Sequence, residues 1–270
     1  HDDEYFVNLS NNLMEPVTVI TKRTILAKAH KIYDVFGFLA PFLVRIKVLL
    51  QKLWKSKVTW DEELKGPIAE AFRAWEEEIP LIKIIAIPRW IKTTKRSRLQ
   101  LHGFCDASES AYGSMMYARV EDEDGEVQVT LLIAKTRVAP LQTMSLARLE
   151  LMAIHCMAKL LEYVRESLPN PIESTHLWSD STIALAWVSK PSTEWKTFVR
   201  NRVQEIHEAV TSSSFHHCPT EENPADDLTR SITLQELMNK KTYWHGPEWL
   251  RREPHQWPRL MGHSSDQEDE

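Results

Sequence analysis

Four acidic residues stand in apolar surroundings at points of the chain where catalysis could use a carboxylate. Asp106, Glu150 and Asp180 each follow or interrupt a short apolar run, and Leu228 comes two residues after Asp226. Carboxylates are rarely buried without a partner, and four converging acids repel one another unless a cation lies between them. Oxygen ligands of this kind suit Mg²⁺ or Mn²⁺. Two such ions, about 3.5–4 Å apart, can activate a water and stabilise the leaving oxygen of a phosphodiester.

The elements that must position these acids are predicted by the hydropathy pattern from residue 99 onward. Strands are expected at 101–106, 111–120, 127–135, 176–180 and 215–218, and helices at 146–168, 181–188, 194–210 and 224–230. Asp124-Gly125 is a strong hairpin turn, and Ser145 is a candidate N-cap for the helix that carries Glu150. Three strands joined by hairpins, followed by strands separated by helices, indicate a mixed sheet covered by helices.

The first 95 residues have a different pattern, which is mainly helical. Residues 42–55 place apolar side chains at the i, i+3, i+4 and i+7 positions of one helix face. A second helix is expected at 61–78, and a short strand at 84–90. The polar, basic run 92–98 is a candidate linker between this part and the strands that follow.

Composition narrows the class of protein. The chain has 270 residues, of which 43% are hydrophobic and 26% charged, which excludes collagen-like, mucin-like and disordered classes. The net charge of −5 comes from acids near the two ends, so no strong basic field marks the body of the chain. Three widely spaced cysteines favour reduced thiols, and no apolar stretch is long enough to span a bilayer. Because the first residue is His, we read the sequence as part of a longer chain.

The four acids lie in motifs whose order is specific. These are Cys-Asp-Ala-Ser, Ala-Arg-Leu-Glu-Leu-Met-Ala, Trp-Ser-Asp-Ser-Thr and Asn-Pro-Ala-Asp-Asp-Leu-Thr-Arg. The set resembles the ribonuclease H domains of retroelement reverse transcriptases. The run KIYDVFGFLAPFLVRIKVLLQKLW, with Trp60-Asp61, Ile-Pro-Arg-Trp and the closing Trp-His-Gly-Pro-Glu-Trp-Leu, is similar to Bel/Pao-type LTR retrotransposon polyproteins. The resemblance covers residues 21–258.

The resemblance implies the fold class and the division of the chain. The fold would be α/β, a ribonuclease H-like mixed five-stranded sheet flanked by helices and preceded by a mainly helical segment. Residues 1–95 would be the C-terminal, thumb- or connection-like part of a reverse transcriptase. Residues 96–232 would form the ribonuclease H-like domain, and residues 233–270 a C-terminal extension with an acidic tail.

The resemblance also implies a role for each acid. Asp106 would bridge two Mg²⁺ ions, for which Mn²⁺ is a substitute. Glu150 and Asp180 would ligate the ion nearer the leaving 3′ oxygen, and Asp226 would hold the ion that activates water. The fourth acid is ambiguous between Asp226 and Asp227, and the Asp-x-Leu-x-Arg pattern favours Asp226. The substrate would be the RNA strand of an RNA–DNA hybrid, cut to leave 5′-phosphate and 3′-hydroxyl ends.

Substrate contacts are expected from residues near the acids, namely Ser108, Arg148, Ser181, Thr182 and His217. For Ser181, Thr182 and His217 a structural role is an alternative. Ser181 and Thr182 also suit helix capping. His217 would substitute for the histidine that many family members carry in the loop before the last acid, because residues 220–225 contain none.

The implied partners are an RNA–DNA hybrid and the remainder of the reverse transcriptase polyprotein, with no membrane. The implied location is intracellular, in a cytoplasmic retroelement particle, and not secreted. Two other functions stay open. One is a non-catalytic module that binds nucleic acid or tethers a polymerase. The other is a DNA-strand transferase of the same superfamily, although such enzymes use three acids at a different spacing.

Overall fold

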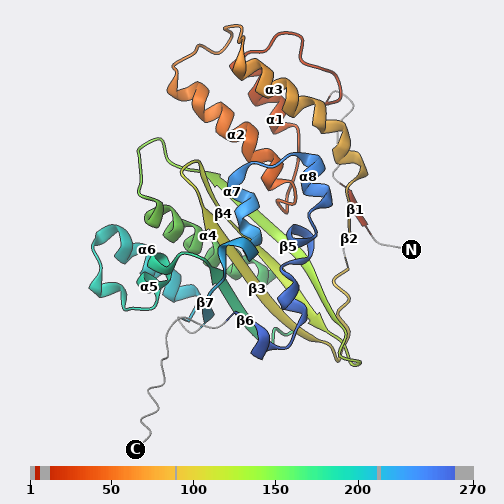
Figure 1. The fold of residues 1–270 in the computed structure, drawn as a ribbon, viewed down its shortest axis with the longest axis vertical. Coiled ribbons are helices and arrows are strands. Elements are labelled where there is room, and N and C mark those ends of the chain that lie inside the picture. The colour runs from red at the N-terminus through yellow and green to blue at the C-terminus, as the bar shows by residue number, and fades with distance from the viewer. Residues whose placement is uncertain (1–3, 7–12, 89, 212–213, 259–270) are drawn as a thin grey trace, which may run out of the picture.

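A five-stranded mixed sheet forms the centre of the computed structural model, which describes residues 4–6, 13–88, 90–211 and 214–258 (Figure 1). The strand order is β5-β4-β3-β6-β7. The strands are β3 (Arg98–Ala107), β4 (Ala111–Glu121), β5 (Val127–Val138), β6 (Ser174–Ser179) and β7 (Phe215–His217). The first three pair antiparallel, whereas β6 and β7 run parallel to β3. This confirms the predicted mixed sheet.

One face of the sheet is covered by α4 (Leu146–Ser167), α5 (Thr182–Val188) and α6 (Thr197–Ala209). The long helix α4 packs on the sheet because Leu149, Ala153, Met157, Leu160 and Val164 form a buried stripe along one side. Together with residues of α5, α6 and the strands, this stripe makes one hydrophobic cluster. The helix thereby fixes the position of Glu150, which follows Leu149.

The other face carries a second hydrophobic cluster that joins distant parts of the chain. It contains α1 (Lys22–His30), α2 (Ala40–Lys55), α3 (Pro67–Glu78), α7 (Asp227–Arg230), α8 (Leu234–Asn239) and α9 (Lys241–His245). Phe42, Trp75, Phe104, Leu228 and Trp249 are all buried in it. The N-terminal and C-terminal segments thus share one core with the sheet, and the division at residues 95 and 232 stays a prediction.

Several elements differ from their predicted bounds, among them a helix and a strand of the N-terminal segment and the helix before β7. The helix expected at 61–78 begins at Pro67, because Gly66 has a φ of +67° and Pro67 takes the first helical position. The strand expected at 84–90 is β2 (Ala86–Pro88), which pairs with β1 (Glu4–Phe6). The helix expected at 194–210 is shortened to α6, and a 3₁₀ turn at Ser192–Glu194 precedes it.

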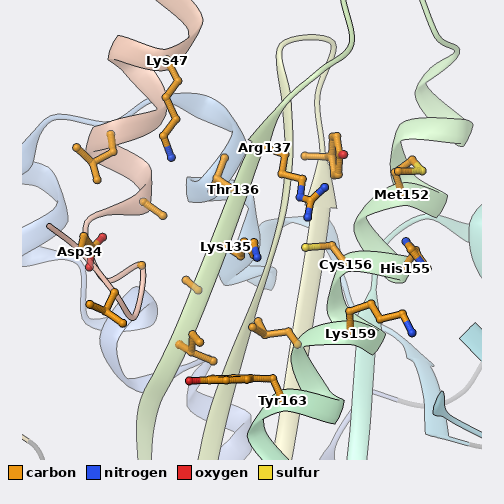
Figure 2. Close-up of a pocket in the computed structure, with 18 of the residues that line it drawn as sticks. Asp34, Lys47, Lys135, Thr136, Arg137, Met152, His155, Cys156, Lys159 and Tyr163 are labelled. Carbon is orange, nitrogen blue, oxygen red and sulfur yellow. The ribbon is translucent and has the colours of Figure 1, made fainter. Parts of the chain in front are cut away.

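The edge strand β5 is where the N-terminal segment meets the sheet. The amide of Ala134 donates a hydrogen bond to the carbonyl of Phe36 at 2.8 Å. Beside this junction, a groove of about 680 Å³ lies between α2, β5 and α4 (Figure 2). Among the described residues, none of the helices is long and apolar enough to cross a membrane.

Candidate metal centre

Two of the predicted acids meet because of the sheet register. The parallel strands β3 and β6 pair Cys105 with Ser179. The residue after Cys105 and the residue after Ser179 are both acids, so Asp106 and Asp180 lie at the same edge of the sheet, on neighbouring strands. The carboxyl ends of parallel strands are the usual ligand-binding edge of open α/β sheets.

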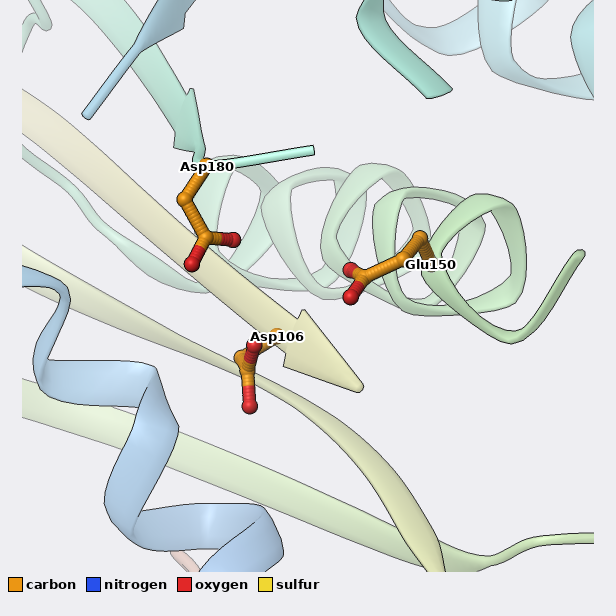
Figure 3. Close-up of side chains that lie close together, drawn as sticks. All are labelled: Asp106, Glu150 and Asp180. Atoms are coloured by element: carbon orange, nitrogen blue, oxygen red, sulfur yellow. The ribbon is translucent and has the colours of Figure 1, made fainter. Parts of the chain in front are cut away.

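Glu150 reaches the same place from α4, one residue beyond the buried Leu149 (Figure 3). Asp106, Glu150 and Asp180 each offer a carboxylate oxygen, and these oxygens lie within 4.8 Å of one another. Asp106 and Glu150 are buried, with exposed fractions of 6% and 7%, and Asp180 is half-buried. We call these three residues the carboxylate cluster.

The electrostatics of the cluster favour protonation when no cation is present. Burial raises the pKa of Asp106 to about 6, with Asp180 and Asp226 adding to the effect and the Thr229 hydroxyl opposing it. Burial, together with the negative charges of Asp106 and Asp180, raises the pKa of Glu150 to about 9. The cluster therefore resists carrying three negative charges by itself.

The residues of the cluster fit a divalent cation. Glu150 Oε2 is buried and has no hydrogen-bond partner among the described residues. No lysine or arginine forms an ion pair with Asp106, Glu150 or Asp180 in that part of the chain. A buried carboxylate oxygen without a partner is costly, and a hard cation with oxygen ligands would remove that cost.

Asp226 lies beside the cluster, but it does not belong to the group of three. It ends the 3₁₀ turn Pro224–Asp226, and its Oδ1 forms an ion pair with Nε of Arg230 at 2.5 Å. Burial raises the pKa of Asp226, Arg230 opposes this, and the charge of Asp180 adds to it. Asp227 is buried and pairs with Lys240 instead. The assignment of the fourth acid stays a prediction.

Ser108 and Arg148 make contacts within the protein. The hydroxyl of Ser108 accepts hydrogen bonds from the amides of Ser110 and Ala111, both at 3.2 Å, so it shapes the turn between β3 and β4. The exposed guanidinium of Arg148 lies over the ring of Phe198, 5.1 Å from its centroid.

The other three substrate-contact candidates lie near Asp180. Ser181 is the N-cap of α5 and accepts a hydrogen bond from the amide of Ala184 at 3.3 Å, whereas Thr182 is exposed in the first turn. His217 ends β7 at the register position opposite Ser179. All five substrate contacts stay predictions. Ser145 precedes α4 as expected, but its side chain makes no capping hydrogen bond.

Two residues that sequence reasoning did not single out hold the site together. Thr229 Oγ1 donates to Asp106 Oδ2 at 2.5 Å and is itself buried. The side-chain nitrogen of Asn223 donates a hydrogen bond to the carbonyl of Cys105 at 3.0 Å. The side-chain oxygen of Asn223 accepts a hydrogen bond from the backbone amide of Ala225. Both belong to the Asn-Pro-Ala-Asp-Asp-Leu-Thr-Arg motif, so a small polar residue three positions after the fourth acid was the available signal.

A mixed five-stranded sheet in this order, with helices on both faces and carboxylates at the end of its central strand, defines a ribonuclease H-like domain. The family model described as Pao retrotransposon-like RNaseH-like domain matches residues 21–181, more than half of the chain. The chain belongs to this family. The matched segment includes Asp106, Glu150 and Asp180 and ends before Asp226.

Solved structures show a weaker likeness. LC11-RNase H1 in complex with an RNA/DNA hybrid is 14% identical, with a TM-score of 0.34 over 52% of this chain and 99% of that one. RNase H1 from Halobacterium salinarum is 12% identical, with a TM-score of 0.29 over 53% and 98%. The protease-reverse transcriptase of prototype foamy virus is 14% identical, with a TM-score of 0.27 over 80% and 26%. Likeness of this degree carries no argument about activity. The comparison with curated proteins gave no match.

Proposed function

We propose that this chain is a metal-dependent endonuclease that hydrolyses the RNA strand of RNA–DNA hybrids. The observation that carries the proposal is the carboxylate cluster, in which three acids from β3, α4 and the end of β6 converge within 4.8 Å without a basic partner among the described residues. Such a set of hard oxygen ligands suits Mg²⁺, with Mn²⁺ as a substitute.

Asp106, Glu150 and Asp180 would hold one side of a two-ion centre, and Asp226 would complete it. When bound, the ions would supply Lewis acidity at the attacking water and at the leaving 3′ oxygen. Hydrolysis adds the water oxygen to the phosphorus and breaks the bond to the 3′ oxygen. The products are a 5′-phosphate and a 3′-hydroxyl, which takes up one proton.

The protein's own part in this reaction is positioning. Thr229 fixes Oδ2 of Asp106 by a hydrogen bond, and Asn223 ties the loop before Asp226 to the end of β3. Glu150, with a pKa of about 9, holds a proton at neutral pH in the absence of metal. Cation binding should therefore release a proton from the site.

We propose that the enzyme works as part of a reverse transcriptase polyprotein inside the cell, with residues 1–95 as its thumb- or connection-like part. The family of the chain supports this setting. Arg148 and Thr182 are exposed near the carboxylate cluster and stay candidates for contact with the nucleic-acid backbone.

The test is cleavage of an RNA–DNA hybrid labelled on the RNA strand, with Mg²⁺, by the unaltered chain and by Asp106→Asn. We expect the unaltered chain to cut the RNA and Asp106→Asn to lose turnover by orders of magnitude, because removing one ligand breaks the cation site. Double-stranded DNA of the same sequence serves as a substrate control and should stay intact.

Two outcomes would replace the proposal. If neither protein cuts the hybrid and both bind it equally, the chain is a nucleic-acid-binding module. If duplex DNA without RNA is the preferred substrate, the strand-transferase alternative takes its place. Circular dichroism of both proteins separates lost chemistry from lost folding.

A further inference from the structure

The groove beside β5 carries an excess of positive charge. Its lining includes five cationic side chains: Lys47 from α2, Lys135 and Arg137 from β5, Lys159 from α4 and Arg202 from α6. We call these five residues and the space between them the basic groove. Figure 2 shows Lys47 on one wall, Lys159 on the other, and Lys135 and Arg137 on the strand between them.

Acids within the protein neutralise only part of this charge. Asp34 also lines the groove, but its two oxygens accept hydrogen bonds from the amides of Phe38 and Leu39, at 3.0 and 2.8 Å. Lys159 pairs with Glu162 at 3.0 Å, and His155, on the same wall, pairs with Glu205 at 2.7 Å.

The remaining cations have spare hydrogen-bonding capacity. Lys47, Lys135 and Arg137 have no side-chain hydrogen bond or ion pair within the described ranges of the chain. The Nε atom of Arg202 is buried and has no hydrogen-bond partner in those ranges, while the guanidinium lies over the ring of Phe198, 4.8 Å from its centroid. Burial in the groove, with the like charge of Lys135, lowers the pKa of Lys47, and Asp34 opposes this.

The basic groove begins at the end of the sheet that carries the carboxylate cluster. Asp106 pairs with Gly113 across β3 and β4, and Gly113 pairs with Thr136 across β4 and β5. Arg137 is the next residue on β5. On α4, Lys159 comes nine residues after Glu150, which is about 13–14 Å at the helical rise. The groove therefore leads away from the cluster along both elements.

This spread of charge suits an extended anion. Lys135 and Arg137 stand two residues apart on one side of β5, about 7 Å at the rise of a strand, and Lys47 and Lys159 face them from separate helices. A single phosphate ion could contact only a few of these groups. A strand of linked phosphates could contact most of them, and lysine and arginine are the side chains that bind phosphate oxygens best.

We propose that the basic groove binds the phosphodiester backbone of the nucleic-acid substrate at a distance from the cleavage position. The proposal rests on the proposed function for the identity of that substrate. It assigns the N-terminal segment a part in substrate binding, because Lys47 on α2 supplies one wall.

Anisotropy of a short fluorescein-labelled RNA–DNA hybrid, in EDTA and over a range of salt concentrations, tests the proposal. The variant is Lys135→Gln with Arg137→Gln. The matched control is Lys55→Gln with Lys83→Gln, which removes two charges at exposed lysines outside the groove. We expect the groove variant to bind at least about tenfold more weakly at low salt, with a salt slope smaller by about one to two units. The control should match the unaltered chain.

Equal salt slopes for the groove variant and the control would overturn the proposal. A groove variant that keeps its affinity for the hybrid but loses affinity for a different anion would also overturn it. The anions to compare are inorganic phosphate and the acidic peptide Ser-Ser-Asp-Gln-Glu-Asp-Glu, which has the sequence of residues 264–270. Cleavage with Mg²⁺ is measured in parallel. Normal cleavage with unchanged slopes overturns the groove alone, and groove-dependent binding without cleavage overturns the nuclease alone.

Lysine acetylation of the unaltered chain gives a second readout that does not depend on variant folding. Hybrid in EDTA should protect Lys47, Lys135 and Lys159 from a water-soluble acetylating reagent, as read by mass spectrometry. Lys55 and Lys83 should react equally with and without hybrid. If added hybrid leaves the acetylation of Lys47, Lys135 and Lys159 unchanged, the proposal is contradicted.

Discussion

Glu150 carries the clearest electrostatic cost in the carboxylate cluster. Its side chain is buried, Oε2 has no partner among the described residues, and two carboxylates lie beside it. Its pKa rises from an ordinary 4.5 to about 9, so the folded protein holds the proton more tightly than the unfolded chain does. The resulting stability is complete below about pH 4.5 and is lost as the pH rises toward 9.

Glu150→Gln should therefore stabilise the metal-free fold at pH 8 by a few kcal/mol, because each unit of pKa shift corresponds to about 1.4 kcal/mol. The difference should vanish as the pH falls below 4.5, because glutamate then becomes neutral in the unfolded state as well. Urea unfolding in EDTA across this range measures it. Added Mg²⁺ should stabilise the unaltered chain more than the variant, because only the unaltered cluster keeps all its ligands. A difference that does not depend on pH would contradict this explanation.

Thr229 is a positioning residue, since it acts through Asp106. Thr229→Val removes the hydrogen bond to Oδ2 and should weaken Mn²⁺ binding by about 10–100-fold, the usual effect of losing such a support. Calorimetric titration with Mn²⁺ measures this. Thr229→Ser keeps the hydroxyl and should restore the affinity. Equal weakening by valine and serine would show that the methyl group matters instead.

The sequence predicted the acids of the site but not Thr229 and Asn223, which hold them in place. Asp106, Glu150 and Asp180 stood out because a carboxylate in an apolar run is unusual. The choice between Asp226 and Asp227 depends on the phase of a helix of only four residues, and neighbouring contacts set that phase. The only signal for Thr229 was its place in the motif that carries Asp226, and a threonine near a helix end is ordinary until its partner is known.

At the scale of elements, a stack of histidines links β3, β6 and β7. His102 and His176 lie 5.0 Å apart, His176 bonds to His216 at 3.1 Å, and Trp257 packs edge-on against His102 and His176. Burial lowers the pKa of all three histidines, and that of His216 falls to about 4. Their contribution to stability is present above about pH 6.5 and is lost as the pH falls.

His216→Phe should make the fold less sensitive to acid, because phenylalanine takes up no proton. Between pH 6.5 and 4 the variant should lose on the order of 2–3 kcal/mol less stability than the unaltered chain. Urea unfolding measures the difference, and tryptophan fluorescence reports on Trp178, 4.7 Å from the His216 ring. Parallel pH curves for the two proteins would contradict the prediction.

The pattern of strands and helices was predictable, whereas their pairing was not. Alternating hydropathy marked the strands, and the apolar stripe marked α4. Asp61 was expected to begin a helix, but it lies before the helix and pairs with Arg23. Parallel pairing of Cys105 with Ser179 decides where the acids meet, and no local pattern specifies a contact across 74 residues.

At the scale of the whole molecule, one junction between the N-terminal segment and the sheet requires a glycine. Gly37 has a φ of +70°, and a Cβ there would lie 1.8 Å from the carbonyl oxygen of Ala134. The neighbouring Phe36 accepts the hydrogen bond from Ala134. Only glycine permits this approach, because both the backbone conformation and the space exclude a side chain.

Gly37→Ala should lower the stability by a few kcal/mol more than Gly125→Ala. Gly125 also has a positive φ, +81°, but nothing lies within 4 Å of its Cβ position, so it reports the conformational cost alone. That cost is about 1–2 kcal/mol. Thermal unfolding of both variants measures the difference. Equal destabilisation would show that the contact with β5 adds nothing.

Whether the N-terminal segment packs on the sheet was not predictable from its own sequence. Its amphipathic helices required a partner, but the identity of that partner depends on side chains from β3 to β5 and from the C-terminal segment. The resemblance supplied an interpretation of residues 1–95, while the shared core and the groove beside β5 emerged only from the arrangement in space.

The most direct measurement for the account as a whole is the anomalous scattering of Mn²⁺ in crystals of the unaltered chain and of Asp106→Asn. We expect manganese to bind between Asp106, Glu150 and Asp180 in the unaltered chain and to be lost in the variant. Manganese bound only elsewhere, or bound at the same place in both proteins, would contradict it.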